Sequence, residues 1–227
     1  YLKGDNINRA KVEKMIREKR AVFSNSIFED PDIDDQAWLK KEEITAFAGH
    51  PLIVGDRTVG IVAMFSRKRF DAADIDAIAS IADKIALGID RKKAEEKVWF
   101  FAYHDTLTGL PNRQFFLKVL KSAVDYAGRY EKKFAVVLLD LDNFKQVNDT
   151  FGHSSGDILL KEVSSRFLKC VRKTDTLARI GGDEFLIVLA NQEQLDGSQL
   201  VAKKIVEALS EPIILDGNSV NVTVSIG

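Results

Sequence analysis

The chain has 227 residues, of which 45% are hydrophobic and 30% charged, so it can bury a core and is too polar for a membrane protein. Its 33 basic and 34 acidic residues give a net charge of -1, which excludes the basic surface of a protein that coats nucleic acid or an anionic membrane. The single cysteine, Cys170, excludes an internal disulfide and a cysteine-clustered zinc site. We therefore expect a cytoplasmic protein with no nucleic-acid partner and no membrane segment within this chain.

The first ninety residues have the pattern of a mixed α+β domain. A helical stretch around Val12, Met15 and Ile16 comes first. Two strand-like runs follow, Ile44 to Val54 and Thr58 to Phe65, and a glycine-containing turn separates them. The sequence therefore predicts a β-hairpin in this part of the chain.

A long helix follows the hairpin. Apolar residues recur there at steps of three and four, at Ile75, Ile78, Ala82, Ile85 and Ile89. This spacing fits a helix packed on its own sheet and equally a dimer seam, and both can hold at different points along it. The charged residues 90–97 include no proline or glycine, so they predict a stiff helical connector. We expect the domain boundary between Asp90 and Asp105.

The second half alternates helices and strands, which predicts an antiparallel or mixed sheet backed by helices. Helices are expected near 113–130, 143–150, 156–171 and 195–209, and strands at 134–139, 176–180 and 185–190. A hairpin through residues 216–218 follows. The alternating residues Val220, Val222, Val224 and Ile226 predict one last strand.

Asp140 stands at the end of a strand, 135–139, that is apolar on both faces and is therefore predicted to be fully buried. A carboxylate is costly to desolvate there unless a cation or hydrogen-bond donors meet it. Asp140 is therefore a candidate metal ligand. Taken alone, an acidic residue after a strand more often only ends the strand.

A second cluster, Gly181-Gly182-Asp183-Glu184-Phe185, lies between two apolar strands. The glycines tolerate a positive φ and leave room for a ligand beside the backbone. If this hairpin lies beside the first strand, Asp140, Asp183 and Glu184 converge on one edge of the sheet. Mg²⁺ prefers such hard oxygen ligands.

These residues belong to a longer set of motifs that resembles the GGDEF-type diguanylate cyclases. The others are Asp105-x-Leu107-Thr108-Gly109-Leu110-Pro111-Asn112-Arg113 and the series from Leu139 through Asn143-Phe144-Lys145, Asn148-Asp149 and Gly152-His153 to Gly156-Asp157. The resemblance covers roughly residues 98–227. It implies a nucleotide-cyclase-like βαββαβ core.

The family condenses two GTP into cyclic di-GMP and two pyrophosphates, with one GTP held by each subunit of a homodimer. By position, Asp140, the backbone carbonyl of Leu141, Asp183 and Glu184 would hold Mg²⁺ or Mn²⁺, and Asp183 would also act as base on the 3′-hydroxyl. The resemblance implies that Asn148, His153 and Asp157 bind the guanine nucleotide and that Lys145 stabilises transition-state charge. His153 taken alone is equally a turn residue.

Arg172 and Asp175 match the family's inhibitory site, where the product cyclic di-GMP binds. On composition alone, the segment that contains them would be a solvated helix end.

The N-terminal part resembles the second half of a GAF sensor domain, from Ala46 to Phe65 and along the helix that follows. This gives three segments: a GAF-like domain at 1–90, incomplete at its N-terminal side, a helical linker at 91–104, and a GGDEF domain at 105–227. Trp38 and His50 could line a pocket for an unknown small ligand, although packing and turn roles are commoner for single residues of these types.

Family members continue past Gly227 with a strand and a helix that carry basic residues for the triphosphate. The GGDEF domain is therefore expected to be incomplete at its C-terminal side, which predicts poor GTP binding or inactivity for the chain as given. The leading hypothesis is a dimeric diguanylate cyclase that its GAF domain and its product regulate. The alternative is a catalytically inactive GGDEF module that acts as a receptor for cyclic di-GMP or GTP.

Overall fold

The computed structural model describes residues 9–29, 36–190 and 196–227, and the chain divides after Lys97 into two compact units. Helix α3 (Ala72–Tyr103) begins in the N-terminal unit, and its residues from Val98 onward belong to the C-terminal unit. The predicted continuous helix through the charged segment 90–97 is therefore confirmed. Among the described residues, no helix is both long enough and apolar enough to cross a bilayer.

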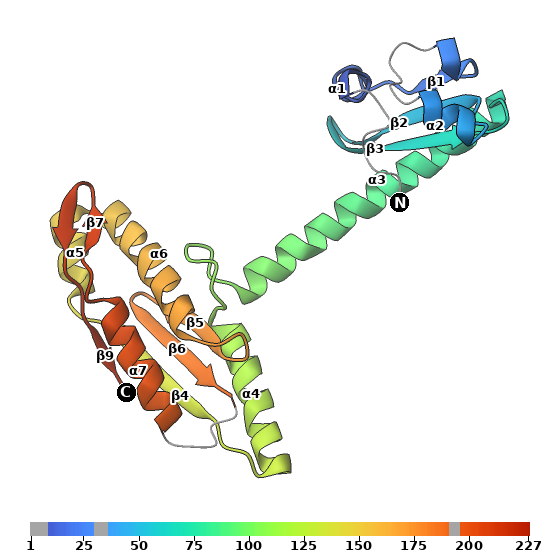
Figure 1. The fold of residues 1–227 in the computed structure, drawn as a ribbon. Helices are drawn as coiled ribbons and strands as arrows, with labels where there is room; N and C mark the ends of the chain where they lie inside the picture. The colour runs from blue at the N-terminus through green and yellow to red at the C-terminus, as the bar shows by residue number, and fades with distance from the viewer. Residues whose placement is uncertain (1–8, 30–35, 191–195) are drawn as a thin grey trace. The chain divides into compact units, whose positions relative to one another are not determined.

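The N-terminal unit is built on a three-stranded antiparallel sheet with the order β1-β2-β3 (Figure 1). Its strands are β1 (Val22–Ser24), β2 (Ala46–Val54) and β3 (Arg57–Ser66), and the predicted hairpin is β2–β3. Helices α1 (Arg9–Glu18) and α2 (Gln36–Lys41) and a 3₁₀ turn at Ile27–Glu29 complete it.

Helix α3 packs against the sheet of the N-terminal unit through small side chains. Ala82 and Ala86 are fully buried and form a cluster with Leu52 of β2. The prediction that this helix packs on its own sheet is therefore confirmed for that face. Ile81 and Ile85 remain 51% and 38% exposed, and a dimer seam along them stays a prediction.

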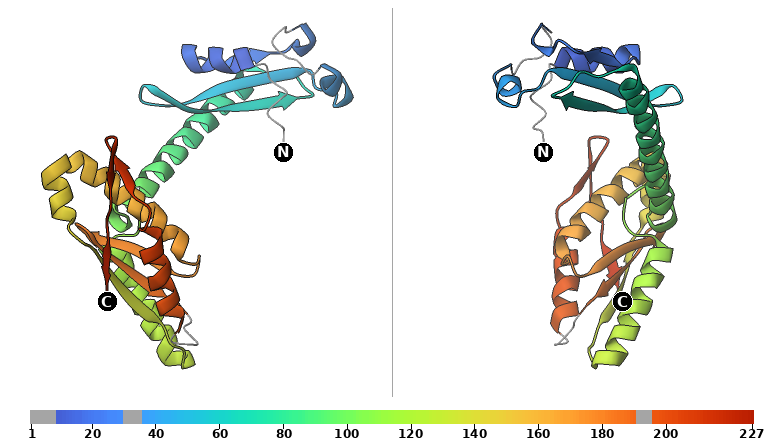
Figure 2. Two further views of the ribbon diagram at one scale, coloured as in Figure 1. Left: turned by 60° about the vertical axis from the view of Figure 1, so that its left-hand side comes forward. Right: turned by 90° about the vertical axis from the view of Figure 1, so that its right-hand side faces the viewer.

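The C-terminal unit is a four-stranded, fully antiparallel sheet with the order β5-β6-β4-β9. Its strands are β4 (Ala135–Leu141), β5 (Thr176–Gly181), β6 (Glu184–Leu189) and β9 (Val224–Ile226). Helices α6 (His153–Cys170) and α7 (Asp196–Ala208) cover one face, and α4 (Arg113–Tyr130) lies on the other, as Figure 2 shows. The predicted βαββαβ order is confirmed.

Two details of the predicted sheet were wrong. Strand β4 is buried on one face only, because α4 packs over β5 and β6 and leaves Val136 and Leu138 of β4 43% and 47% exposed. The alternating run at the end is two strands, since Val220 ends β8 (Asn218–Val220), which pairs with β7 (Ile213–Leu215), whereas Val224 begins β9. Alternation shows which side chains face inward but not which strand is the partner.

A tight corner joins α5 (Phe144–Phe151) to α6. Gly152 is the only residue between them, so it ends one helix and begins the next, with φ +83°. Its N–H donates to the carbonyl of Asn148 at 2.9 Å. A residue with a side chain is strained at this φ, so glycine is what allows so short a connection.

Candidate functional site

The hairpin between β5 and β6 carries two of the candidate metal ligands. Gly181 pairs with Glu184, and Gly182 and Asp183 form the turn between them. Gly182 has φ +54°, a conformation that glycine adopts without strain. The turn therefore presents Asp183 and Glu184 at one end of the sheet.

Strand β4 brings Asp140 to the same end. Asp140 lies directly opposite Glu184 of β6, and the N–H of Leu141 donates to the carbonyl of Asp183 at 3.3 Å. The structure therefore gathers all four predicted metal ligands at one edge: Asp140, Leu141, Asp183 and Glu184.

The donor set of this edge fits a hard divalent cation. Side chains directly opposite each other in an antiparallel pair lie on the same face, and like charges there are mutually repulsive. Asp140 and Glu184 are such a pair, so a cation between them would relieve their repulsion. In the described part of the chain, however, no three His, Cys, Asp or Glu side chains are already arranged around a possible metal position. The backbone places the ligands, and their side chains would have to turn toward a bound ion.

The predicted nucleotide residues gather at the corner between α5 and α6. Lys145 is exposed in the first turn of α5, and His153 and Asp157 are exposed in the first turns of α6. Asn148 is half-buried, and its Oδ1 lies against the backbone of Gly156. The corner therefore offers an amide and a carboxylate from two adjoining helices.

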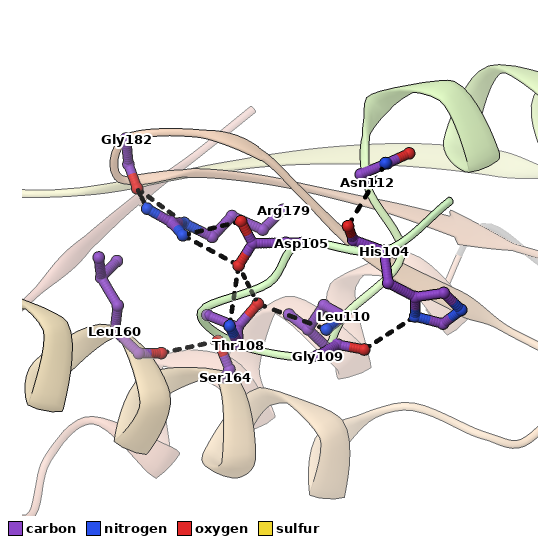
Figure 3. Close-up of polar contacts among 10 residues, drawn as sticks. All are labelled: His104, Asp105, Thr108, Gly109, Leu110, Asn112, Leu160, Ser164, Arg179 and Gly182. Atoms are coloured by element: carbon purple, nitrogen blue, oxygen red, sulfur yellow. Dashed lines mark hydrogen bonds and ion pairs between the residues drawn. The ribbon is translucent and has the colours of Figure 1, made fainter. Parts of the chain in front are cut away.

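An ion pair between Arg179 and Asp105 lies next to the β5–β6 turn (Figure 3). The Nη1 of Arg179 lies 2.9 and 3.1 Å from the two carboxylate oxygens of Asp105. The Nε and Nη2 of the same guanidinium donate to the carbonyl of Gly182 at 2.9 and 2.8 Å. One side chain thus joins the β5–β6 turn to the segment that follows α3.

Asp105 is held in place by its own loop. The N–H and hydroxyl of Thr108 donate to Oδ1 of Asp105 at 2.9 and 2.6 Å. Partial burial acts to raise the pKa of Asp105, but the hydrogen bonds from Thr108 and the charge and hydrogen bonds of Arg179 together lower the pKa below its usual range. The carboxylate is therefore ionised and paired at neutral pH.

The sequence alone gave no reason to assign a role to Asp105 or Arg179. Asp105 begins one of the recognised motifs and Arg179 stands two residues before another, but the two lie 74 residues apart, and no local spacing indicates that they pair. A charged residue inside an otherwise apolar strand such as β5 was the one available signal.

Models of known protein families match both parts of the chain. A family model described as "Diguanylate cyclase, GGDEF domain" matches residues 102–227, and a GAF domain model matches residues 5–90. The chain belongs to the GGDEF diguanylate cyclase family. The predicted resemblances to both families are confirmed.

Curated relatives are similar to this chain over only part of their own length. Diguanylate cyclase A of Treponema denticola is 32% identical over 185 residues, which cover 78% of this chain and 48% of the relative. The bifunctional diguanylate cyclase/cyclic di-GMP phosphodiesterase MucR of Pseudomonas aeruginosa is 42% identical over 135 residues, which cover 60% of this chain and 20% of the relative. The chain thus spans less than half the length of either relative.

Solved structures share the fold of the GGDEF domain. The coiled coil and GGDEF domain of DgcB from Caulobacter crescentus, in complex with c-di-GMP, is 29% identical with a TM-score of 0.60, and the match covers 65% of this chain and 79% of that one. The GGDEF domain of TpbB from Pseudomonas aeruginosa is 38% identical with a TM-score of 0.54, over 55% of this chain and 73% of that one.

The predicted inhibitory-site residues of the GGDEF domain form a turn before β5. The carboxylate of Asp175 accepts from the N–H of Arg172 at 2.9 Å and from the N–H of Ala190 at 3.3 Å. The side chain of Arg172 is exposed. Asp175 therefore stabilises the turn itself, whereas the exposed side chain of Arg172 is accessible to a ligand.

The two predicted pocket residues of the GAF unit lie in different places. Trp38 packs edge-on against Phe65 at 5.4 Å between ring centroids, as a core residue does. His50 lines a cavity of only about 10 Å³ with Val22 and Ile78. That volume holds no more than a water molecule, so this cavity is too small for a ligand, and a ligand-binding role for Trp38 or His50 stays a prediction.

Proposed function

We propose that the GGDEF domain of this chain catalyses the condensation of two GTP into cyclic di-GMP and two pyrophosphates. The observation that carries the proposal is the placement of Asp140 opposite Glu184 beside the Gly182-Asp183 turn, in a chain of the diguanylate cyclase family. In each half-reaction a 3′-hydroxyl oxygen attacks the α-phosphorus of the other GTP, and pyrophosphate leaves.

The carboxylates of Asp140, Asp183 and Glu184 and the carbonyl of Leu141 would hold Mg²⁺ or Mn²⁺, whose charge neutralises phosphate oxygens when it is bound. Asp183 is half-buried in the turn between β5 and β6, and its carboxylate would accept the proton of the 3′-hydroxyl. Lys145 supplies a point charge for the phosphates from the first turn of α5.

Asn148 and Asp157 would bind the guanine base, and His153 lines the same corner. An amide offers both a donor and an acceptor, and a carboxylate accepts from the N1–H and amino group of guanine. Because two GTP molecules react with each other, each subunit of a homodimer would hold one.

We propose two controls on this activity. The GAF unit would respond to a small ligand and act on the cyclase through α3, and cyclic di-GMP would inhibit by binding at Arg172 and Asp175. We place the reaction in the cytoplasm, which supplies GTP and keeps a thiol such as that of Cys170 reduced.

The test is to incubate the full-length protein with GTP and Mg²⁺ and to measure cyclic di-GMP by chromatography. Product from the wild type, with at least a roughly thousandfold loss in Asp183→Asn, supports the proposal. No product from the wild type, together with tight binding of cyclic di-GMP, would replace it with the receptor function.

A further inference from the structure

Gly156 lies in contact with the side chain of Asn148. A Cβ at Gly156 would lie 2.0 Å from Oδ1 of Asn148, 3.0 Å from its Cγ and 3.4 Å from Cζ of Phe144. An approach of 2.0 Å is far inside any van der Waals contact, so residue 156 can carry no side chain while Asn148 keeps this position.

The backbone gives no other reason for glycine at this position. Gly156 lies within α6, in a helical conformation that residues with side chains adopt readily. Glycine is less favourable than alanine inside a helix. The residue type is therefore explained by the space that Asn148 occupies.

We propose that Gly156 is a positioning residue, which fixes the amide of Asn148 for guanine and thereby contributes to the choice of GTP over ATP. This inference rests on the proposed function, in which Asn148 binds the base. Gly156 itself touches Asn148 and not the nucleotide's reacting atoms.

The corner around Gly156 is too rigid to absorb an added methyl group. Gly152 is the single residue between the two helices. The N–H of Gly156 donates to the carbonyl of Gly152 at 3.2 Å. The hydroxyl of Ser155, a residue 1% exposed, lies 2.9 Å from the carbonyl of Phe151 and 2.6 Å from Asp216. Because these hydrogen bonds fix the start of α6, a methyl group at residue 156 would displace the side chain of Asn148 and not the helix.

The first experiment needs no nucleotide and compares melting temperatures. In the wild-type background, Gly156→Ala is expected to raise Tm by at least about 2 °C less than it does once the Asn148 side chain is removed, because the methyl group must displace the amide of Asn148. In an Asn148→Ala background, where the clash is gone, the same substitution is expected to raise Tm by about 2–4 °C. Gly128→Ala in α4 is the matched control, since nothing lies within 4 Å of its added Cβ, and it should raise Tm in both backgrounds.

The second experiment measures nucleotide preference in the full-length protein. Gly156→Ala is expected to raise KM for GTP about tenfold, the loss of about one hydrogen bond, while kcat at saturating GTP stays near the wild-type value. Direct binding should show the same tenfold loss for GTP and no change for ATP. Gly128→Ala should leave all these values unchanged.

An equal change in Tm for Gly156→Ala in the two backgrounds would overturn the steric part of the inference. A difference between the two backgrounds with an unchanged ratio of GTP to ATP affinity would overturn the role in specificity. If the wild type binds GTP but forms no cyclic di-GMP, the proposed reaction fails, and the binding ratio still decides the role of Gly156.

Discussion

Asp105 and Arg179 stand 74 residues apart in the chain and form a bifurcated contact, with Nη1 of Arg179 within 3.1 Å of both carboxylate oxygens. The two side chains are only 23% and 11% exposed. Asp105 comes two residues after the end of α3, and Arg179 donates to the carbonyl of Gly182 in the turn between β5 and β6. The position of that turn therefore depends on a residue outside the sheet.

Removal of the charge on Asp105 should weaken the domain. Asp105→Asn is expected to lower the free energy of unfolding by about 1–3 kcal/mol at pH 7, because a charge-assisted pair is lost. The pKa of Asp105 is lower in the folded than in the unfolded chain, so its contribution is complete above the ordinary value of 3.8 and is lost as the pH falls through the lower folded-state pKa. Urea titrations should therefore show the difference between variant and wild type shrinking below about pH 4.

Asp125→Asn is the control for that experiment, since Asp125 is exposed on α4. It should change the free energy of unfolding by less than about 0.5 kcal/mol at either pH. A difference between Asp105→Asn and wild type that stayed constant down to pH 2 would contradict the ion-pair explanation.

Replacement of Arg179 by lysine should impair catalysis although the charge is kept. A lysine can donate to Asp105 or to the carbonyl of Gly182 but cannot reproduce the guanidinium fork that contacts both. The turn that carries Asp183 would then be held less well, and we expect kcat to fall about ten- to hundredfold. Steady-state assays of cyclic di-GMP formation would measure this. The exposed Arg129→Lys should behave like the wild type, and equal activity of both variants would show that the fork is dispensable.

Asp140→Asn should separate stability from activity. In EDTA, it is expected to stabilise the domain by about 0.2–1 kcal/mol, because Asp140 and Glu184 repel each other across the strand pair. Addition of Mg²⁺ should raise the Tm of the wild type through binding and leave the variant nearly unchanged. Calorimetry with and without Mg²⁺ measures both effects. A variant less stable than the wild type in EDTA would mean that the two carboxylates do not repel each other.

Substitutions of Arg172 and Asp175 should have different effects on stability, although both should relieve inhibition. Arg172→Ala is expected to relieve inhibition by cyclic di-GMP without a change in Tm, because its side chain is exposed. Asp175→Ala should relieve inhibition and also lower the free energy of unfolding by about 1–3 kcal/mol, since two backbone N–H groups lose their acceptor. Cyclase assays titrated with product, beside thermal melts, would check both. Equal inhibition of wild type and Arg172→Ala would remove this site from the regulation.

The sequence was sufficient for the elements whose patterns are local. The hairpin of β2 and β3, the long helix α3 and the strand before Asp140 followed from periodicity and turn residues. The edge that gathers Asp140 and Glu184 was predicted on the condition that two strands are neighbours, and the register confirms that they are.

Features that depend on tertiary packing could not be predicted. The exposure of Val136 and Leu138 depends on where α4 lies, and the division of the run from Val220 to Ile226 depends on which strand each half pairs with. The contact of Gly156 with Asn148 depends on the angle between two helices. None of these is encoded in spacing along the chain.

Because only Gly152 connects α5 to α6, the number of residues between Asn148 and Asp157 matters for function. One inserted residue in a helix turns everything beyond it by about 100°, and here no loop exists to absorb that rotation. An insertion or deletion between Asn148 and Asp157 would therefore point these two side chains in different directions even if both helices formed. We expect proteins that share this corner to keep its number of residues fixed, as well as the glycines at positions 152 and 156.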